Sequence, residues 1–256
     1  MTSDERSSRR RVALVTGAGR GIGAAIVERL ISTGHVVVGI DVDEPLLAEL
    51  AQRFAPTDLL TVVGDVGEPA VWDEAVQLAH AAAGAVSVLV NNAAISPKVD
   101  GHRVPSDQVA RADWDEVLRV NLTGAFLGFQ ATVGDMREQG WGRIVMMSSG
   151  SAKAGARVAG VHYGTSKAAL LGLTRTLALE LGPEGITVNA VTPGRIATSM
   201  AAEVSAEVNQ MFLDEIPVGR LGTGADIAAM VDFLASDDAG FITGATFDVN
   251  GGGYIG

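Results

Sequence analysis

Tyr163 and Lys167 are the two residues whose types and spacing point most directly to chemistry. They lie four positions apart at the start of an apolar segment, so a helix would place both side chains on one face. A phenol has a pKa near 10 and is a poor proton carrier at neutral pH, but a nearby ammonium favours the phenolate and lowers that pKa. We therefore expect Tyr163 to exchange a proton with an alcohol or carbonyl oxygen. The competing interpretation is a surface helix that carries an aromatic residue and a cation at ordinary spacing.

A glycine-rich turn near the N-terminus supplies a candidate phosphate site. An apolar run over residues 11–16 is followed by Gly17-Ala-Gly-Arg-Gly-Ile-Gly23 and then by a helical pattern. A strand that enters a helix through glycines gathers free N–H groups and the positive end of the helix at one point, where a pyrophosphate fits. The spacing is G-x-x-x-G-x-G rather than the common G-x-G-x-x-G, and a tight turn without a ligand is the alternative.

Apolar runs alternate with helical patterns along the chain. The predicted strands cover residues 11–16, 35–40, 59–63, 86–90, 143–147, 187–191 and 245–249, and the predicted helices cover residues 24–33, 68–83, 114–139, 162–181, 201–214 and 226–236. This alternation predicts an α/β fold: a Rossmann-type, doubly wound parallel sheet of about seven strands with helices on both faces, in a single domain. Ligands of such sheets bind beyond the carboxyl ends of the strands, where the strand order reverses.

Polar and small residues stand where these strands end. Asp41 is placed to accept hydrogen bonds from the hydroxyls of an adenosine ribose, and the alternative is that Asp41 or Asp43 caps the next helix. Asp65 is placed to reach the adenine edge, while Asn92 and Ala93 end a strand with side chains that permit close approach of a cofactor. The strand ends therefore predict a dinucleotide site.

Asn121 is a polar residue within the apolar pattern of residues 114–139. A buried asparagine must be hydrogen-bonded. We therefore interpret Asn121 as either a structural group that kinks the helix or a member of a proton relay.

Three segments have a less regular pattern. Residues 1–10 are polar and are expected to form a disordered tail, which leaves residues 11–256 as the catalytic domain. Residues 96–112 form a polar loop with Lys98, His102 and Arg103, and this loop either admits substrate or is a surface excursion. Residues 195–217 are a candidate substrate lid, and an ordinary packed surface helix is the alternative. The apolar stripe of the lid consists of Val204, Val208, Met211 and Phe212.

Composition excludes several classes of function. The 256 residues suit one α/β domain with a full-sized core. The absence of cysteine excludes disulfides, thiolate zinc sites and cysteine nucleophiles, and it fits a reducing, cytoplasmic location. The net charge of −11 argues against nucleic-acid and anionic-membrane partners, and no apolar run is long enough to span a membrane. No metal site is predicted.

The segment from about residue 11 to residue 253 resembles the single-domain branch of the short-chain dehydrogenase/reductase family. The matching pieces are Thr16-Gly-Ala-Gly-Arg-Gly-Ile-Gly23, Asn91-Asn-Ala-Ala94, Asn121, Ser148-Ser149, Tyr163-Gly-Thr-Ser-Lys167 and Pro193-Gly194. They occur in the family's order and close to its spacings. Ala94 replaces the usual glycine. A further serine, Ser151, leaves open which hydroxyl orients the substrate, and we prefer Ser149 because it directly follows the strand.

The resemblance implies hydride transfer between a nicotinamide and a secondary alcohol or ketone. It makes Tyr163 the acid/base, lets Ser149 hydrogen-bond the substrate oxygen and gives Asn121 a water relay. It places Lys167 on the nicotinamide ribose, where it also lowers the pKa of Tyr163. The expected cofactor-binding residues are Gly17, Arg20, Gly21, Ile22, Gly23, Asp41, Asp65, Val66, Asn92, Ala93, Tyr163, Lys167, Pro193, Gly194, Ile196 and Thr198. Relatives are typically homotetramers that bury the helices expected at 114–139 and 162–181.

Asp41 favours NAD(H) over NADP(H), because its carboxylate would face the 2′-phosphate of NADP; Arg20 works against this preference. The expected substrate is a polyol, a sugar, a hydroxy acid or another small alcohol. The first alternative is reduction of a 3-oxoacyl thioester carried by acyl-carrier protein. The remote alternative is a catalytically silent NAD-binding regulatory module, which would be expected to lack Tyr163 or Lys167. The physiological direction of the reaction stays open.

Overall fold

Seven apolar segments form one parallel sheet in the computed structural model, which describes residues 10–198 and 206–256. The strands are β1 (Val12–Thr16), β2 (Val36–Asp41), β3 (Leu59–Val63), β4 (Val86–Asn91), β5 (Gly142–Met147), β6 (Ile186–Pro193) and β7 (Thr246–Val249). Their order is β3-β2-β1-β4-β5-β6-β7, so the order reverses between β1 and β4. This arrangement confirms the predicted Rossmann-type sheet and places the ligand crevice at the carboxyl ends of β1 and β4.

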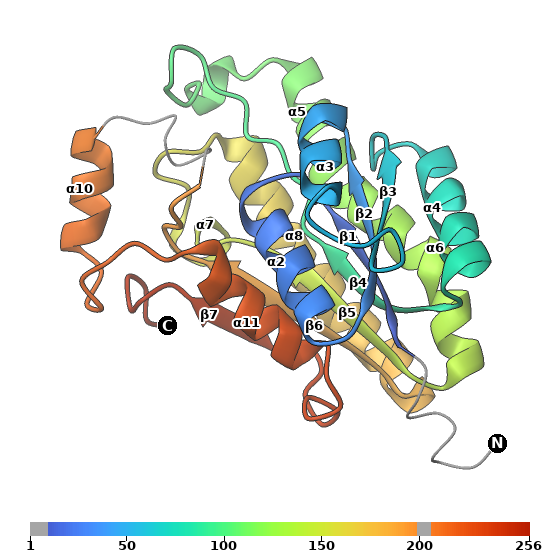
Figure 1. The fold of residues 1–256 in the computed structure, drawn as a ribbon. Coiled ribbons are helices and arrows are strands. Elements are labelled where there is room, and N and C mark those ends of the chain that lie inside the picture. The colour runs from blue at the N-terminus through green and yellow to red at the C-terminus, as the bar shows by residue number, and fades with distance from the viewer. Residues whose placement is uncertain (1–9, 199–205) are drawn as a thin grey trace.

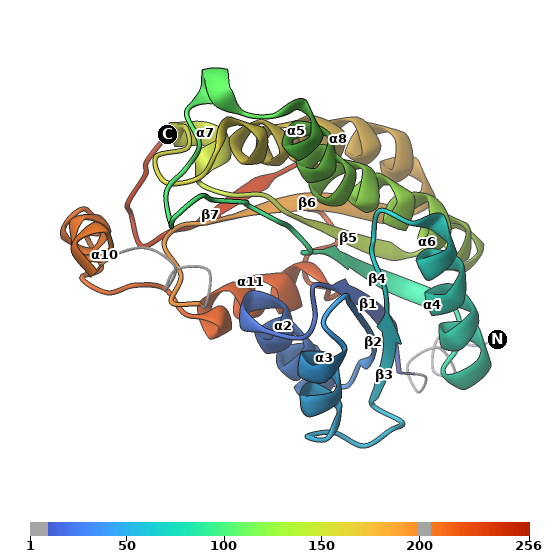
Figure 2. The ribbon, with the colours of Figure 1, turned by 90° about the horizontal axis from the view of Figure 1, so that it is seen from above.

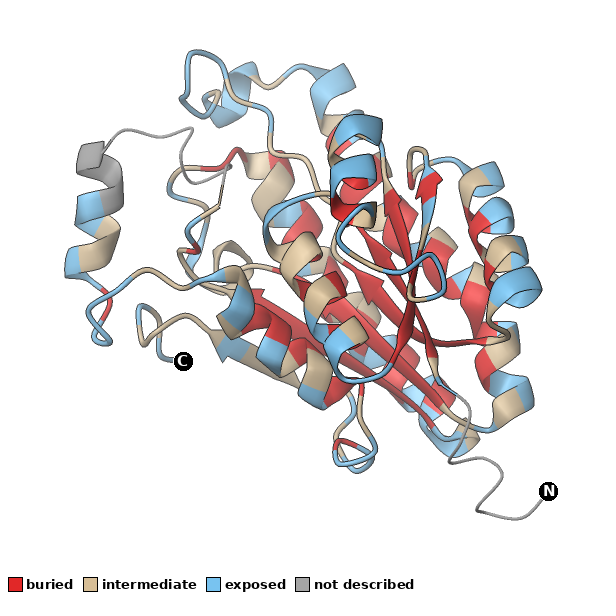
Figure 3. Cartoon of the chain, in the orientation of Figure 1, coloured by how far each residue is buried: buried red, intermediate tan, exposed pale blue. Residues whose placement is uncertain are grey.

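Helices cover both faces of the sheet (Figures 1 and 2). One face packs against α2 (Gly21–Ser32), α3 (Glu44–Ala51) and α11 (Gly224–Leu234). The other packs against α4 (Pro69–Ala82), α6 (Gly124–Gln139) and α8 (Val161–Leu181). Strands enclosed in this way are apolar on both faces, which is why β1 and β4 consist entirely of buried residues (Figure 3).

The remaining helices are short and lie in the connections. They are η1 (Ser106–Gln108), α5 (Arg111–Leu118), η2 (Arg119–Thr123), α7 (Ser151–Ala154), η3 (Gly182–Glu184) and α10 (Ala206–Asp214). Asp43 begins α3 by accepting a hydrogen bond from the backbone N–H of Leu46 at 3.1 Å. Of the two aspartates considered as caps, Asp43 therefore has that role.

The helix predicted for residues 114–139 is present, but it begins at Arg111 and is not a regular α-helix throughout. The structure has two α-helices, α5 and α6, joined by a π-helical turn, η2, at Arg119–Thr123. A π-turn inserts a residue into the hydrogen-bond ladder without ending the apolar pattern, so the periodicity did not reveal it. Asn121 lies in this turn and is buried.

Arg10 makes defined contacts with the rest of the chain. Arg10, which we placed in the tail, pairs with Asp58 at 2.6 Å and donates to the backbone oxygens of Gly34 and His35. Residues 1–9 lie outside the described residues, as do Val204 and the side chain of Val208 from the expected lid stripe. Within the described ranges, no helix is long and apolar enough to cross a membrane.

Candidate active site

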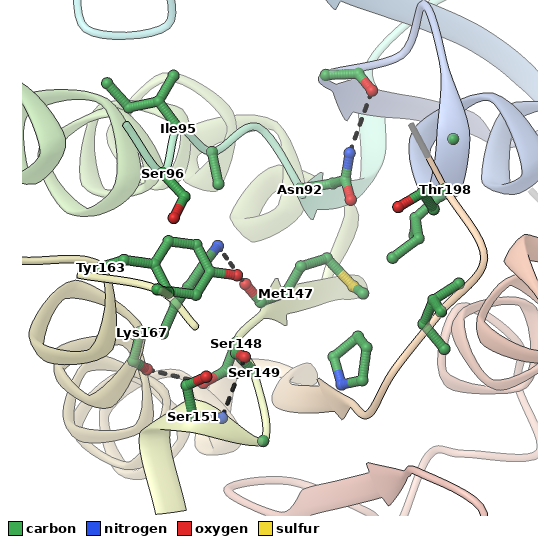
Figure 4. A pocket seen from close by; sticks show the side chains of 18 of the residues that line it. Asn92, Ile95, Ser96, Met147, Ser148, Ser149, Ser151, Tyr163, Lys167 and Thr198 are labelled. Carbon is green, nitrogen blue, oxygen red and sulfur yellow. Dashed lines mark hydrogen bonds between the residues drawn. The ribbon is translucent and has the colours of Figure 1, made fainter. Parts of the chain in front are cut away.

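A cavity of about 600 Å³ lies at the carboxyl ends of the strands. It brings together all sixteen of the cofactor-binding residues expected from the sequence, together with Ser149. Figure 4 shows Tyr163, Lys167 and Ser149 on one wall, with Asn92 and Thr198 across the cavity. Asn121 is the one expected site residue that does not line the cavity.

The glycine turn between β1 and α2 fits a pyrophosphate. Gly17 and Gly21 have φ of 62° and 58°, in the left-handed region that glycine adopts without strain. A Cβ on Gly23 would lie 1.8 Å from the backbone oxygen of Gly17, so this close approach also requires glycine. Arg20 is the N-cap of α2, and its side chain makes no capping hydrogen bond to the first amides of that helix. Those amides can therefore receive an anion at the positive helix end.

Asp41 is held against the glycine turn. Its carboxylate accepts hydrogen bonds from the backbone N–H of Gly19 at 2.8 Å and of Asp43 at 3.1 Å. These contacts fix a negative charge in the cavity wall where β2 ends. Arg20 lines the same part of the cavity, but its exposed position leaves its long side chain able to turn toward solvent.

Hydrogen bonds of Asn92 connect the end of β4 to the glycine turn. Its side-chain amide donates to the backbone oxygens of Thr16, at 2.8 Å, and Gly17, at 3.2 Å. In return, the Thr16 hydroxyl accepts the backbone N–H groups of Asn92 and Ala93, both at 2.9 Å. The crevice between β1 and β4 is therefore held at a fixed width before any ligand enters.

Asp65 also lies in the cavity wall and is held by two donors. Its carboxylate pairs with Arg119 of the π-turn at 2.5 Å and accepts the backbone N–H of Gly67 at 2.8 Å. The guanidinium holds the pKa of Asp65 below its usual value. The expected contact between Asp65 and adenine stays a prediction.

Two hydrogen bonds join helix α8 to the end of β5 beside Tyr163. The Lys167 ammonium donates to the backbone oxygen of Met147 at 2.7 Å, and the Ser148 hydroxyl donates to the backbone oxygen of Lys167 at 2.7 Å. The Lys167 nitrogen lies 5.8 Å from the centre of the Tyr163 ring. The expected grouping of Tyr163 with Lys167 on one helix face is therefore present.

The expected lowering of the Tyr163 pKa is wrong for this cavity. Burial raises the pKa of Tyr163, and the hydrogen bond from Ser149 only partly opposes that effect. Burial also lowers the pKa of Lys167 to about 7, so the ammonium is itself destabilised. The sequence showed the charge of Lys167 but not the loss of water around both groups, and the loss of water is the larger effect.

Ser149 is the serine that interacts with the Tyr163 phenol. The Ser149 hydroxyl also accepts the backbone N–H of Ser151 at 3.1 Å, which orients it at the start of α7. This geometry favours Ser149 over Ser151 for contact with a substrate oxygen.

Asn121 anchors the connection after β4 from behind the cavity wall. Its side chain accepts the backbone N–H of Ile95 at 2.8 Å and donates to the backbone oxygen of Ile95 at 3.0 Å. It also donates to the Ser166 hydroxyl at 3.1 Å. These bonds match the interpretation of Asn121 as a structural group at a kink; the water relay stays a prediction.

Residues of several connections also line the cavity. Phe212 of the expected lid lies there, with the guanidinium carbons of Arg195 and Arg157 at 5.1 and 5.7 Å from its ring centre. Arg157 also pairs with Glu215 just after α10. Sequence analysis gave neither arginine side chain a role, although Arg195 is the first residue of the expected lid, and the only signal of Arg157 was a cation within a run of small residues.

Only part of the loop at residues 96–112 lines the cavity. Lys98 lines the cavity, whereas His102 and Arg103 do not. His102 contacts the backbone oxygen of Asp100 through its ring, and Arg103 donates to the backbone oxygen of Ala156 at 3.4 Å. No group of three or more potential metal ligands occurs among the residues that the structure describes.

Comparison with known proteins gives a consistent result. A family model described as enoyl-(acyl carrier protein) reductase matches residues 17–253. Acetoacetyl-CoA reductase of Rhizobium meliloti is 42% identical over 247 residues, covering 96% of this chain and 99% of the relative. A 3-oxoacyl-[acyl-carrier protein] reductase structure from Brucella melitensis superposes with a TM-score of 0.92 at 35% identity, covering 100% of this chain and 97% of the other. Another such reductase from Brucella melitensis, with bound NAD, has a TM-score of 0.90 at 33% identity and the same coverage.

Proposed function

Because this chain belongs to the short-chain dehydrogenase/reductase family and is an oxidoreductase acting on CH–OH and ketone groups, we propose that it reduces a 3-oxoacyl thioester with NADH. The observation that carries the proposal is the contact of Ser149 with Tyr163, a partly buried residue in the wall of the same cavity as the glycine turn. The names of the relatives favour the thioester over the polyol or sugar that we first expected.

The protonation state of Tyr163 is compatible with the reduction of a ketone. Burial raises the pKa of Tyr163, so the phenol is protonated at neutral pH, which is the form that a proton donor must have. The Ser149 and Tyr163 hydroxyls would both donate hydrogen bonds to the ketone oxygen. The nicotinamide, when bound, supplies the hydride to the carbonyl carbon. Tyr163 delivers the proton to the oxygen, so the ketone becomes a secondary alcohol and Tyr163 becomes a phenolate.

Lys167 then stabilises the phenolate. With a pKa of about 7, it exchanges protons readily at neutral pH, and in its charged form it favours the anionic tyrosine. Its bond to the Met147 backbone oxygen sets the position of the ammonium within the cavity wall. Lys167 would also hold the hydroxyls of the nicotinamide ribose.

Asp41 supports NAD(H) as the cofactor. Its carboxylate is fixed where β2 ends, in position to accept the two hydroxyls of an adenosine ribose. A 2′-phosphate at that place would be repelled. We further propose a homotetramer in which α6 and α8 contact partner subunits, and a cytoplasmic location.

The test is a comparison of initial rates with NADH. Acetoacetyl-CoA and an acetoacetyl thioester of N-acetylcysteamine represent the proposed class, while a panel of polyols, sugars and hydroxy acids with NAD represents the other class. We expect kcat/KM for acetoacetyl-CoA to exceed that for every member of the panel by about 10²-fold or more, since only the proposed substrate fills the substrate end. A polyol, sugar or hydroxy acid that is turned over faster would overturn the thioester assignment.

A further inference from the structure

Tyr163 lies in the first turn of α8, where backbone N–H groups have no partner within the helix. The residue at the N-cap position is Gly160, and it has no side chain with which to accept one of these groups. Serine, threonine, aspartate or asparagine usually performs this task, by accepting the N–H of the second or third helical residue. The third helical residue here is Tyr163.

His162 provides the missing acceptor. Its ring nitrogen Nδ1 accepts the backbone N–H of Tyr163 at 2.8 Å, and the imidazole is only 2% exposed. A Cβ on Gly160 would lie 2.5 Å from Cε1 of this ring, so the imidazole occupies the space that a normal capping side chain would need. The glycine at the N-cap and the histidine two residues later therefore form one capping unit.

The backbone of Tyr163 is held on both sides by side chains. His162 accepts its N–H, and the Ser166 hydroxyl donates to its backbone oxygen at 2.8 Å. Ser166 is in turn held by Asn121 of the π-turn at 3.1 Å. The position of the phenol thus depends on two side-chain contacts that lie outside the cavity chemistry itself.

Only the neutral imidazole with its proton on Nε2 can accept at Nδ1. Burial lowers the pKa of His162 from 6.5, and Asp113 on the adjacent helix α5 opposes this shift. The positive end of α8 also disfavours a charged imidazole. Protonation at Nδ1 would replace the acceptor by a second donor that faces the Tyr163 N–H.

We propose that His162 is a positioning residue that caps the amide of Tyr163 and that its protonation releases the cap and reduces activity in acid. The kinetic test of this inference rests on the proposed function, because it measures reduction of the proposed substrate. Tyr163 and Lys167 do not produce such an acid loss, because both are protonated at low pH and the protonated phenol is the form that ketone reduction requires. An acid limb below pH 6.5 that disappears when His162 is replaced is therefore assigned to His162 and not to the carboxylates of the cavity wall.

Three substitutions of His162 distinguish the effect of its hydrogen-bond acceptor from the effect of its side-chain volume. His162→Asn places an oxygen close to the position of Nδ1, His162→Gln places one close to Nε2, and His162→Leu keeps bulk without an acceptor. We expect the Asn variant to keep kcat for acetoacetyl-CoA within about threefold of wild type and to lose the acid limb, whereas the Gln and Leu variants lose about tenfold in kcat at pH 7.5 with little change in KM for NADH.

A double variant and a remote histidine complete the experiment. Gly160→Ser combined with His162→Ala supplies a standard N-cap hydroxyl, and we expect it to recover the kcat that His162→Ala alone loses. His35 is the matched control, since it is also buried and its pKa is also lowered by burial. It directly precedes β2 and therefore lies at the amino ends of the strands, away from the cavity. His35→Asn should keep the acid limb. Wild-type kcat in His162→Leu, or an unchanged acid limb in His162→Asn, would overturn the proposal.

An independent readout separates this inference from the proposed function. Nitrogen-15 NMR of the histidine rings should show Nδ1 of His162 unprotonated at pH 7, with the proton on Nε2. Absence of acetoacetyl-CoA turnover in wild type would contradict the proposed function alone. A proton on Nδ1 at pH 7 would contradict the cap alone.

Discussion

At the scale of single residues, the site consists of two titratable groups that are both driven toward their neutral forms. Burial raises the pKa of Tyr163 and lowers that of Lys167 to about 7. The neutral phenol is the form that reduction of a ketone requires, and burial keeps Tyr163 in that form. The ammonium is the useful form for stabilising the phenolate that follows. When Tyr163 gives up its proton, we therefore expect Lys167 to take its charged form beside the phenolate.

Removal of the phenol oxygen tests Tyr163 directly. Tyr163→Phe keeps the ring and its packing, and we expect kcat to fall by about 10²–10⁴-fold because the general acid is lost. The NADH dissociation constant, measured by fluorescence titration, should stay within about twofold of wild type, since the ring still lines the cavity. Activity within about tenfold of wild type would show that another group donates the proton.

Removal of the buried ammonium tests the cost of placing it there. The folded pKa of Lys167 is about 7 and the ordinary value is 10.5, so between these values the unfolded chain binds a proton that the folded chain does not. Stability therefore rises with pH through that window, and the cost of burial is fully present below pH 7.

We expect Lys167→Met to abolish activity and, at pH 7, to raise the free energy of unfolding by about 1–3 kcal/mol, because the lost bond to the Met147 oxygen offsets part of the gain. Denaturant unfolding at pH 7 and pH 10 checks this prediction. The gain in the free energy of unfolding should be smaller at pH 10 than at pH 7. An equal gain at both pH values would show that burial does not lower the pKa of Lys167.

Asp41 tests cofactor preference. Two like charges about 4 Å apart repel by ~1 kcal/mol in water and by about 4 kcal/mol at an effective dielectric constant near 20. We therefore expect kcat/KM with NADH to exceed that with NADPH by about tenfold or more, and Asp41→Ala to move the ratio toward NADPH. A wild-type preference for NADPH, or an unmoved ratio in the variant, would contradict the role proposed for Asp41.

At the scale of elements, two hydrogen bonds join the end of β5 to α8. The expected lid contacts the rest of the chain through side chains in and just after α10. Ser148 and Lys167 each bond the opposite element at 2.7 Å. The lid instead presents Phe212 to two guanidinium groups and pairs Glu215 with Arg157. Exposed ion pairs such as the latter contribute little to stability. The proposed acid/base pair is thus held by hydrogen bonds between a strand and a helix, whereas the expected lid is held by exposed contacts.

The lid prediction concerns Phe212, which lines the cavity. Phe212→Ala should raise KM for acetoacetyl-CoA by about 5–30-fold, since a partly buried aromatic side chain contributes about 1–2 kcal/mol, and should leave KM for NADH nearly unchanged. Met211→Ala is the matched control, because the neighbouring Met211 is 47% exposed and does not line the cavity. A lower melting temperature with unchanged kinetics would reduce this helix to a packing role.

At the scale of the whole molecule, the strands and the doubly wound sheet could be predicted because each strand is an apolar run that ends in glycine or a polar residue. The cofactor residues could be predicted because parallel strands place their carboxyl ends at one edge. The π-turn could not, since the apolar pattern continues through it. The pairing of Asp65 with Arg119 and the sign of the Tyr163 pKa shift could not either, because both depend on which groups the fold removes from water.

The proposed tetramer predicts the role of an exposed leucine on α8. Leu179 is 84% exposed in the single chain, although it lies on a helix that is buried along its other face. Leu179→Glu should convert tetramers to smaller species in sedimentation velocity, because a charge would be placed in an apolar contact. Val63→Glu, at an exposed position on the edge strand β3, is the control and should leave the mass unchanged. A monomeric wild type would contradict the prediction.

The two ends of the cavity are built from different kinds of segment. The dinucleotide end is made by turns that follow strands of the sheet, whereas Lys98, Arg157, Phe212 and Tyr254 line the substrate end from connections and from the C-terminal segment. None of these four residues lies in a strand of the sheet. We therefore expect that loops grafted from a relative can change the ketone that is accepted, while the strands and Tyr163 stay in place. Natural divergence of substrate range can follow the same route.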